Sequence, residues 1–381
     1  MITRGLLVLL ALLGNGYVWI GLINRLHAVA GRRKLIDALT YTGFGAFCLL
    51  GLVTAVVPWH DWATVFSPGG STPLAAYGYA CAAVGALQLL RRLLPPSEDR
   101  PAVLLSQRSE PAAPDLPWGA VALHGSAARL MGRLPYNEVR RPVVEHKELA
   151  VPGLPEPLVG LVVCHLSDLH MTGRTDRAFY ELLGQTLERL KFDVLAVTGD
   201  VIEKEACRPW LNETLAGWRA PLGVYYVLGN HDLYIDDGPT RETIDRLGWT
   251  PTVDRWVEAE WRGVSVAIGG SERPWYGGEP GAPPPREACP FRVVLSHTPD
   301  RIGWARGVGA ELVLAGHTHG GQIRPPVLGP IASPSSYGTR FASGSFLVGR
   351  TAMHVSRGVS GKTPLRWNCP PEIALLTLRT G

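Results

Sequence analysis

The sequence lacks the features that mark disulfide-rich, thiolate-metal or nucleic-acid-binding proteins. Its six cysteines include no Cys-x-x-Cys pair, which argues against a disulfide framework and against a thiolate zinc site. Free, mostly buried thiols in a reducing compartment are the simplest interpretation. The net charge is only +4 and no dense Lys/Arg run occurs, so no nucleic-acid partner is expected.

Formal charge is also missing from long stretches of the N-terminal part. Three uncharged, largely apolar runs occupy residues 5–24, 38–59 and 62–90. About 20 apolar residues suffice to cross the hydrocarbon core of a bilayer. The first two runs meet this length, whereas the most apolar part of the third, 74–90, is shorter and richer in Ala and Gly. We expect about three transmembrane helices within residues 1–94, with two as the alternative.

The first apolar run is expected to remain in the protein as an anchor, because it lacks a small-x-small cleavage site and further apolar runs follow it. Basic residues lie between the first two runs and directly after the third, for example Arg33 and Arg91, whereas residues 60–73 contain no Lys or Arg. With three spans, the positive-inside tendency therefore predicts a multi-pass protein whose large domain is cytoplasmic. With two spans this argument no longer holds.

Composition changes after the apolar runs. From Pro95 to about Trp118 the chain is rich in Pro, Ser, Ala and charge without periodicity, which is typical of a linker. Residues 123–134 have the pattern of a short amphipathic helix, more simply a surface helix than a membrane-bound one. We therefore assign residues 95–138 to a linker and residues 139–381 to a globular domain.

The globular part contains five short apolar runs that each end in Asp, Asn or His. Such runs suit strands that are buried on both faces, and ligands in layered α/β folds bind outside the carboxyl ends of strands. Five polar motifs at five strand ends are therefore expected to converge on one rim. The motifs are Asp168-Leu169-His170, Gly199-Asp200, Gly229-Asn230-His231-Asp232, Ser296-His297 and Gly316-His317-Thr318-His319.

These motifs offer seven carboxylate, amide and imidazole donors and no thiolate. The mixture suits Mn, Fe, Zn or Mg better than copper or an iron–sulfur cluster. Seven donors are too many for one tetrahedral ion, but they suit two divalent metals that share a carboxylate. Each motif alone has an ordinary explanation, such as a tight turn, but five in order favour a metal site. The candidate ligands are Asp168, His170, Asp200, Asn230, His297, His317 and His319.

The five motifs resemble the signature of the calcineurin-like metallophosphoesterase family. The continuation Gly320-Gly321-Gln322 is similar to the membrane-associated, YkuE/YaeI-like bacterial branch of that family. The resemblance spans residues 139–378 and implies an α/β fold, a four-layer α/β/β/α sandwich, behind the N-terminal transmembrane segment. It also implies a location in the bacterial inner (plasma) membrane.

The resemblance assigns the ligands to two divalent metal ions, with manganese as the favoured element. It implies one ion on Asp168, His170, Asp200 and His319, and a second on Asp200, Asn230, His297 and His317. The nucleophile would be a metal-bound hydroxide. His231 is the catalytic candidate beside the leaving oxygen, Asp232 is expected either to orient it or to hold a turn, and Asn230 and His231 are expected to contact substrate.

The function implied is hydrolysis of a phosphodiester or pyrophosphate bond by a dinuclear metal-dependent phosphoric ester hydrolase. A membrane lipid such as UDP-2,3-diacylglucosamine is a candidate substrate, because an anchored domain meets amphiphiles at the membrane surface. The alternative is a non-catalytic membrane sensor or scaffold that binds a nucleotide or partner through the same domain. A Gly/Pro-rich insertion at 274–290, with Trp275 and Tyr276, is either a loop at the rim of the site or an ordinary surface loop. The sequence leaves the oligomeric state open.

Overall fold

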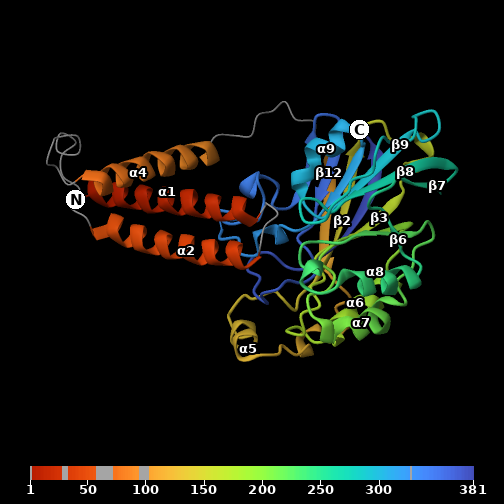
Figure 1. The fold of residues 1–381 in the computed structure, drawn as a ribbon, viewed down its shortest axis with the longest axis horizontal. Helices are drawn as coiled ribbons and strands as arrows, with labels where there is room; N and C mark the ends of the chain where they lie inside the picture. Colours follow the sequence, from red (N-terminus) through yellow and green to blue (C-terminus); the bar gives the residue numbers. More distant parts are fainter. Residues whose placement is uncertain (1, 28–32, 57–71, 94–102, 327) are drawn as a thin grey trace. The chain divides into compact units, whose positions relative to one another are not determined.

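A computed structural model describes residues 2–27, 33–56, 72–93, 103–326 and 328–381. The chain divides into two compact units, unit 1 (Met1–Arg100) and unit 2 (Pro101–Gly381), and Figure 1 shows the helices of the first and the sheets of the second.

Among the described residues, unit 1 contains three helices: α1 (Ile2–His27), α2 (Arg33–Val56) and α4 (Thr72–Leu93). Helix α1 packs closely against α4, because Gly14 lies against the backbone of the partner helix: a Cβ at Gly14 would lie 1.7 Å from the Cys81 carbonyl oxygen. Small residues permit such close helix contacts in membranes. A polar contact joins the same helices, with the Trp19 indole N–H donating to the Tyr77 hydroxyl over 2.8 Å.

The number of membrane spans stays a prediction. Over the described residues, only Gly5–Leu26 is both long and apolar enough to cross a membrane, while the apolar stretches Ala38–Leu52 and Ala76–Leu90 are shorter. Residues 60–71, whose lack of basic charge supports the orientation argument, lie outside the described part of the chain. The structure therefore supports one candidate span and leaves the multi-pass, cytoplasmic arrangement untested.

Unit 2 is built on two mixed sheets. The first has the order β1 (Leu104–Pro111), β2 (Val143–Val151), β13 (Glu372–Thr380), β3 (Val162–Leu166), β4 (Val194–Thr198), β5 (Val224–Val227) and β6 (Thr250–Pro251). The second has the order β11 (Gly344–Val348), β12 (Thr351–Val355), β10 (Leu312–Ala315), β9 (Phe291–Ser296), β8 (Val264–Ser271) and β7 (Val257–Trp261). The helices are α5 (Ser126–Gly132), α6 (Ala178–Arg189), α7 (Arg208–Leu215), α8 (Asp237–Arg246) and α9 (Ile302–Gly307).

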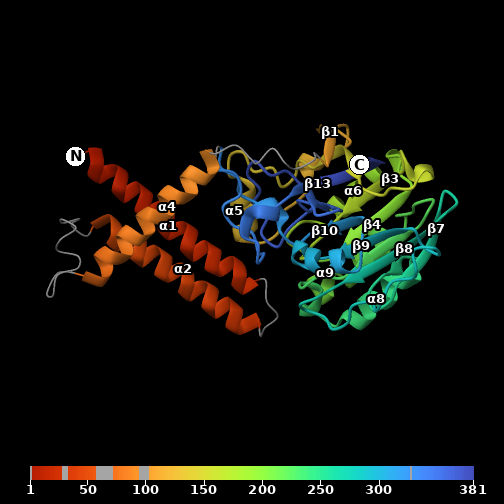
Figure 2. The same ribbon diagram turned by 90° about the horizontal axis from the view of Figure 1, so that it is seen from above.

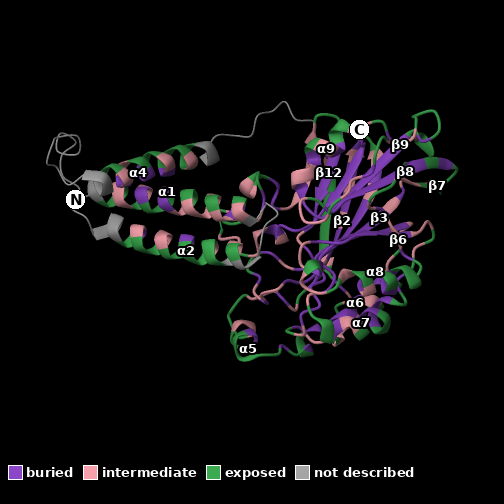
Figure 3. Cartoon of the chain, viewed as in Figure 1, coloured by how far each residue is buried: buried purple, intermediate pink, exposed green. Residues whose placement is uncertain are grey.

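The alternation of side chains along the strands produces the layers. On β4, Leu195 and Val197 pack with α6, α7 and α8, whereas Val194 and Ala196 point into a core between the two sheets. A third core joins the outer face of the second sheet to α9. Figure 3 shows these strands as the buried part of unit 2. The predicted α/β/β/α sandwich is confirmed, and its strands are apolar on both faces because both faces are covered.

The structure differs from the predicted linker over residues 104–138. β1 pairs antiparallel with β2 at the edge of the first sheet, and α5 also lies within unit 2. Most β1 side chains are exposed, so this edge strand carries none of the apolar alternation that identifies a half-buried strand. The compact unit therefore begins well before residue 139.

Candidate metal centre

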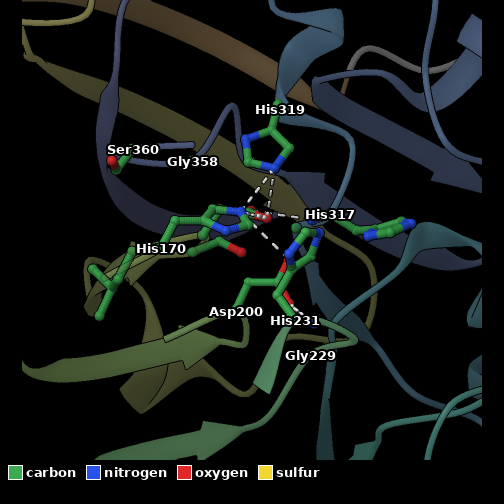
Figure 4. A network of polar contacts seen from close by, with 12 residues as sticks. His170, Asp200, Gly229, His231, His317, His319, Gly358 and Ser360 are labelled. Carbon is green, nitrogen blue, oxygen red and sulfur yellow. Dashed lines mark hydrogen bonds and ion pairs between the residues drawn. The ribbon is translucent and has the colours of Figure 1, made fainter. Parts of the chain in front are cut away.

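The strand order brings the five motifs together. β3, β4 and β5 run parallel in the first sheet, and β9 and β10 run parallel in the second. Each motif begins at or just beyond the carboxyl end of one of these strands. Figure 4 shows His170, Asp200 and His319 pointing toward one another from different segments.

Backbone strain is concentrated at the predicted ligands. Five of them adopt positive φ, namely Asp168 (57°), His170 (47°), Asp200 (53°), His317 (72°) and His319 (50°). Residues other than glycine rarely occupy this left-handed region, and such strain tends to cluster at functional sites. The tight turns direct successive side chains of one motif toward the same point.

Two motif glycines lie so close to neighbouring side chains that no larger residue would fit in their place. A Cβ at Gly229 would lie 2.2 Å from Asp200 Oδ1, and one at Gly316 would lie 1.7 Å from the Ser167 hydroxyl oxygen. Any larger residue would therefore push the turns apart and displace the ligand-bearing loops.

The first ligand group contains Asp168, His170, Asp200 and His319. His170 Nε2 lies 3.0 Å from His319 Nε2 and 3.4 Å from Asp200 Oδ2. His319 Nε2 lies 3.3 Å from Asp168 Oδ1. The two carboxylates and His170 are fully buried, so these atoms face one another rather than bulk water.

The second ligand group contains Asp200, His297 and His317, with Asn230 beside it. His297 Nε2 lies 3.2 Å from Asp200 Oδ2, 3.1 Å from Asn230 Oδ1 and 3.1 Å from His317 Nδ1. Asp200 belongs to both groups, which is the geometry expected of a bridging carboxylate. All seven predicted ligands are thus brought together.

The donor set fits divalent cations. His297 Nδ1 bonds to the Thr198 carbonyl oxygen over 2.7 Å, so Nε2 of the neutral ring has its lone pair toward Asp200 and Asn230. Asp168 Oδ1 and Asp200 Oδ2 are buried without a hydrogen-bond partner. Buried acceptors that face one another are costly unless a cation lies between them, and oxygen and imidazole ligands suit Mn, Fe or Zn.

The negative field of the carboxylates changes the pKa values of the facing histidines. Burial alone lowers the pKa of His170, but Asp168, Asp200 and Glu203 outweigh burial and raise it to about 10. Burial likewise lowers the pKa of His297, and Asp200 and Asp168 raise it to about 9. Without metal the centre therefore attracts protons to the same atoms that would bind a cation.

Glu203, which belongs to none of the five sequence motifs, places a carboxylate between two of the candidate residues. It accepts from His170 Nδ1, and its Oε1 lies 2.9 Å from His231 Nδ1. A carboxylate on the far nitrogen of a ligating histidine fixes the tautomer and the ring orientation. The available signal was its position three residues after Asp200, in the same turn.

Asp232 has a structural role rather than the orienting role considered for it. Its carboxylate accepts hydrogen bonds from the backbone N–H groups of Val201 (2.9 Å), Ile202 (2.8 Å) and Gly229 (2.8 Å). These bonds join the turn after β4 to the turn after β5. None of them involves the His231 ring, whose Nδ1 lies 2.9 Å from Glu203 Oε1.

The Gly/Pro-rich insertion reaches the centre. The ring of Trp275 lies 4.7 Å from that of His317 and 5.5 Å from that of His297, centroid to centroid. Of the two interpretations of residues 274–290, the loop at the rim of the site is therefore correct.

Comparison with known proteins agrees with this geometry. Residues 161–321 match the family model for the calcineurin-like phosphoesterases. The chain contains a calcineurin-like metallophosphoesterase domain.

Three relatives are similar to the chain. The metallophosphoesterase YkuE of Bacillus subtilis is 27% identical over 60% of this chain and 82% of the relative. The UDP-2,3-diacylglucosamine pyrophosphatase LpxG of Chlamydia muridarum is 25% identical over 58% of this chain and 84% of its own length. The phosphodiesterase YaeI of Escherichia coli is 38% identical, but over only 27% of this chain and 38% of that protein. By name, these relatives are a metallophosphoesterase, a pyrophosphatase and a phosphodiesterase, and the names do not share one substrate.

Proposed function

We propose that this protein hydrolyses a phosphodiester or pyrophosphate bond at a centre of two divalent metal ions bridged by Asp200. The observation that carries the proposal is the pair of ligand groups that share this one buried carboxylate, whose Oδ2 has no hydrogen-bond partner. Manganese is the favoured ion. Two such ions supply an activated water and neutralise charge that develops on the phosphoryl oxygens.

The residues around the centre suggest a division of roles. Asp168, His170, Asp200 and His319 would hold one ion, and Asp200, Asn230, His297 and His317 the other. His231 is 15% exposed in its side chain and is held at Nδ1 by Glu203. Its Nε2 is then available to donate a proton or hydrogen bond to the leaving oxygen.

The substrate we favour is a lipid with a phosphodiester or pyrophosphate bond. Two observations support this choice: α1 contains a candidate membrane span, and one relative is by name a UDP-2,3-diacylglucosamine pyrophosphatase. The bacterial inner membrane is the corresponding location.

The experiment uses the purified full chain in detergent with Mn²⁺, and Asp200→Asn as the blank. Release of UMP from UDP-2,3-diacylglucosamine is followed beside hydrolysis of bis-p-nitrophenyl phosphate. Metal-dependent hydrolysis of either compound that is lost in Asp200→Asn supports the enzyme. Absence of hydrolysis from both would contradict it and favour the sensor or scaffold function.

A further inference from the structure

The segment from α5 to Tyr136 exposes large apolar side chains to solvent. Leu130 and Leu134 are 66% and 44% exposed, and Tyr136 is 79% exposed. The opposite side of the same segment is anchored, because Leu123 and Ala128 belong to a small buried cluster. Single exposed leucines are common on protein surfaces, but a contiguous exposed apolar patch marks a site of interaction with a partner or a membrane.

A second group of exposed apolar side chains follows β10 and precedes β13. It consists of Ile323, Leu328, Ile331, Tyr337 and Trp367. Ile323 and Trp367 form an isolated β-bridge, so the two loops that carry this group are fixed to each other. The first loop follows the candidate ligand His319 in the chain, and the second contains Arg366, which lies beside the same histidine.

Hydrogen bonds connect the two groups into one surface. The Asn137 amide donates to the carbonyl oxygens of Met131 and Pro364, each over 2.9 Å. The same side chain accepts from the Arg366 backbone N–H over 3.0 Å. Figures 1 and 2, at right angles, both show α5 and the blue loops after β10 at the same end of unit 2.

This surface adjoins the metal centre. Arg366 is fully buried, and its Nη2 lies 3.4 Å from Nδ1 of the ligand His319. Arg366 and the exposed Trp367 are neighbours in the chain. The loop that carries Trp367 therefore also contacts the metal centre, through Arg366.

Basic residues predominate in the chain segments that carry the surface, while the carboxylates of Glu138 and Asp300 adjoin them. Residues 116–137 and 312–371 contain no Asp or Glu, whereas they contain Arg129, Arg133, Arg324 and Arg340 among their basic residues. Arg129 and Arg133 are exposed and flank Leu130 and Leu134. Exposed apolar residues with interspersed arginines match the interface of a bilayer with anionic lipids.

We propose that the apolar–basic surface, formed by α5 through Tyr136 together with the loop residues 323–326, 328–337 and 364–367, docks unit 2 onto an anionic membrane. The apolar side chains enter the headgroup region and the arginines bind lipid phosphates. The docked surface presents a membrane lipid to the metal centre, a step that rests on the proposed function. The docking itself does not depend on it.

The test uses the full chain reconstituted in nanodiscs. Cys48, an exposed native cysteine, is replaced by Cys48→Ser, and one new cysteine is introduced as Leu134→Cys for an environment-sensitive fluorophore. The matched control carries the fluorophore at Glu260→Cys, an exposed position on β7. Spin-labelled lipids are then added as quenchers to discs with and without phosphatidylglycerol.

We expect the fluorophore at position 134 to be quenched several-fold more than the one at position 260, with the difference increasing in phosphatidylglycerol. Equal quenching at the two positions would overturn the docking proposal. This result is obtained whether or not the protein hydrolyses a substrate, so failure of docking and failure of the proposed function are distinguishable.

A second variant tests the consequence for catalysis. The double substitution Leu130→Glu and Leu134→Glu changes exposed side chains only, so hydrolysis of bis-p-nitrophenyl phosphate in detergent should stay within twofold of wild type. Release of UMP from UDP-2,3-diacylglucosamine in phosphatidylglycerol vesicles should fall at least tenfold. An equal effect on both substrates would contradict a role of the surface in lipid presentation.

Discussion

Two buried polar clusters in unit 2 contain histidines and carboxylates, but of the two only the metal centre has carboxylate oxygens without a hydrogen-bond partner. The second cluster joins the sheets: Lys147 Nζ donates to Glu372 Oε1 and lies 3.0 Å from His354 Nε2. His354 Nδ1 in turn lies 2.8 Å from His165 Nδ1, and His165 Nε2 lies 2.9 Å from the Thr198 hydroxyl. All five residues of this polar network are buried, and each has a partner within it.

Whether the buried carboxylate oxygens have partners distinguishes a structural polar network from a binding site. In the polar network an ammonium group neutralises a carboxylate, and burial lowers the pKa of His354 to about 4, which keeps its ring neutral. In the metal centre, Asp168 and Asp200 have buried oxygens without a partner. A cluster that is complete within the protein stabilises the fold, whereas an incomplete one requires a ligand.

The largest predicted effect is on catalysis. Asp200→Asn removes the shared carboxylate, and we expect kcat/KM to fall about 1000-fold or more, since metal ions contribute several kcal/mol to transition-state stabilisation. The thermal stability of the metal-free protein should fall only modestly, because there Asp200 faces the protonated His170 and His297. Hydrolysis rates and melting with EDTA measure both quantities. A large loss of metal-free stability would assign Asp200 to the fold.

Disrupting the polar network should lower the stability of the fold more than the activity. Glu372→Ala leaves Lys147 buried without its carboxylate and should lower the free energy of unfolding by about 3–5 kcal/mol. Glu258→Ala, on an exposed position of β7, is the matched control and should change stability by about 0.5 kcal/mol or less. Chemical denaturation compares the two variants. Equal stability would mean that the polar network is not structural.

Glu203 combines features of both clusters: it has a hydrogen-bond partner of its own, and that partner is the metal-ligand candidate His170. Glu203→Gln should lower kcat by about 10- to 100-fold, the usual effect of residues that orient metal ligands. Because Glu203 also contacts His231, the pH–rate profile should shift as well. Metal content measured beside the profile separates the two contributions, and a normal profile with normal metal content would exclude a positioning role.

The smallest effect is a pH dependence of metal uptake. His170 and His297 have pKa values raised to about 10 and about 9 in the metal-free fold, above the ordinary value for histidine. Their protonation stabilises the metal-free protein fully below the unfolded pKa, and this contribution is lost as pH rises through 9 to 10. Mn²⁺ must displace these protons, so its affinity should decrease as pH is lowered.

Calorimetric titration at pH 8 in two buffers of different ionisation enthalpy measures the displaced protons. We expect release of about two protons as the metal binds. His354 has a lowered pKa and therefore releases no proton. Glu372→Ala should consequently leave the number of protons released on metal binding unchanged. Mn²⁺ binding without proton release would contradict the assignment of His170 and His297 as ligands.

The ligands were predictable because each follows a strand that is apolar on both faces. Runs such as Asp193–Thr198 are easy to recognise, and parallel strands bring their carboxyl ends to one edge. The order of motifs along the chain therefore sufficed to bring Asp168, Asp200 and His319 together. The layered fold followed from the same runs and from the family resemblance.

The remaining features depend on contacts that have no local pattern. Lys147 and Glu372 belong to strands far apart in the sequence and become partners only when β2 and β13 pair. β1 is an exposed edge strand, and the backbone donors that hold Asp232 come from another turn. Glu203 lies three residues beyond Asp200 in the turn after β4, and its place between His170 and His231 appears only in the folded chain.

The central claim is that unit 2 holds two metal ions bridged by Asp200. Elemental analysis of the purified full chain after equilibration with Mn²⁺, beside Asp200→Asn, tests this claim most directly. The account predicts two bound ions per wild-type chain and a clear loss in the variant. Equal metal content in the two proteins, or hydrolysis by a wild-type chain that binds no metal, would contradict it.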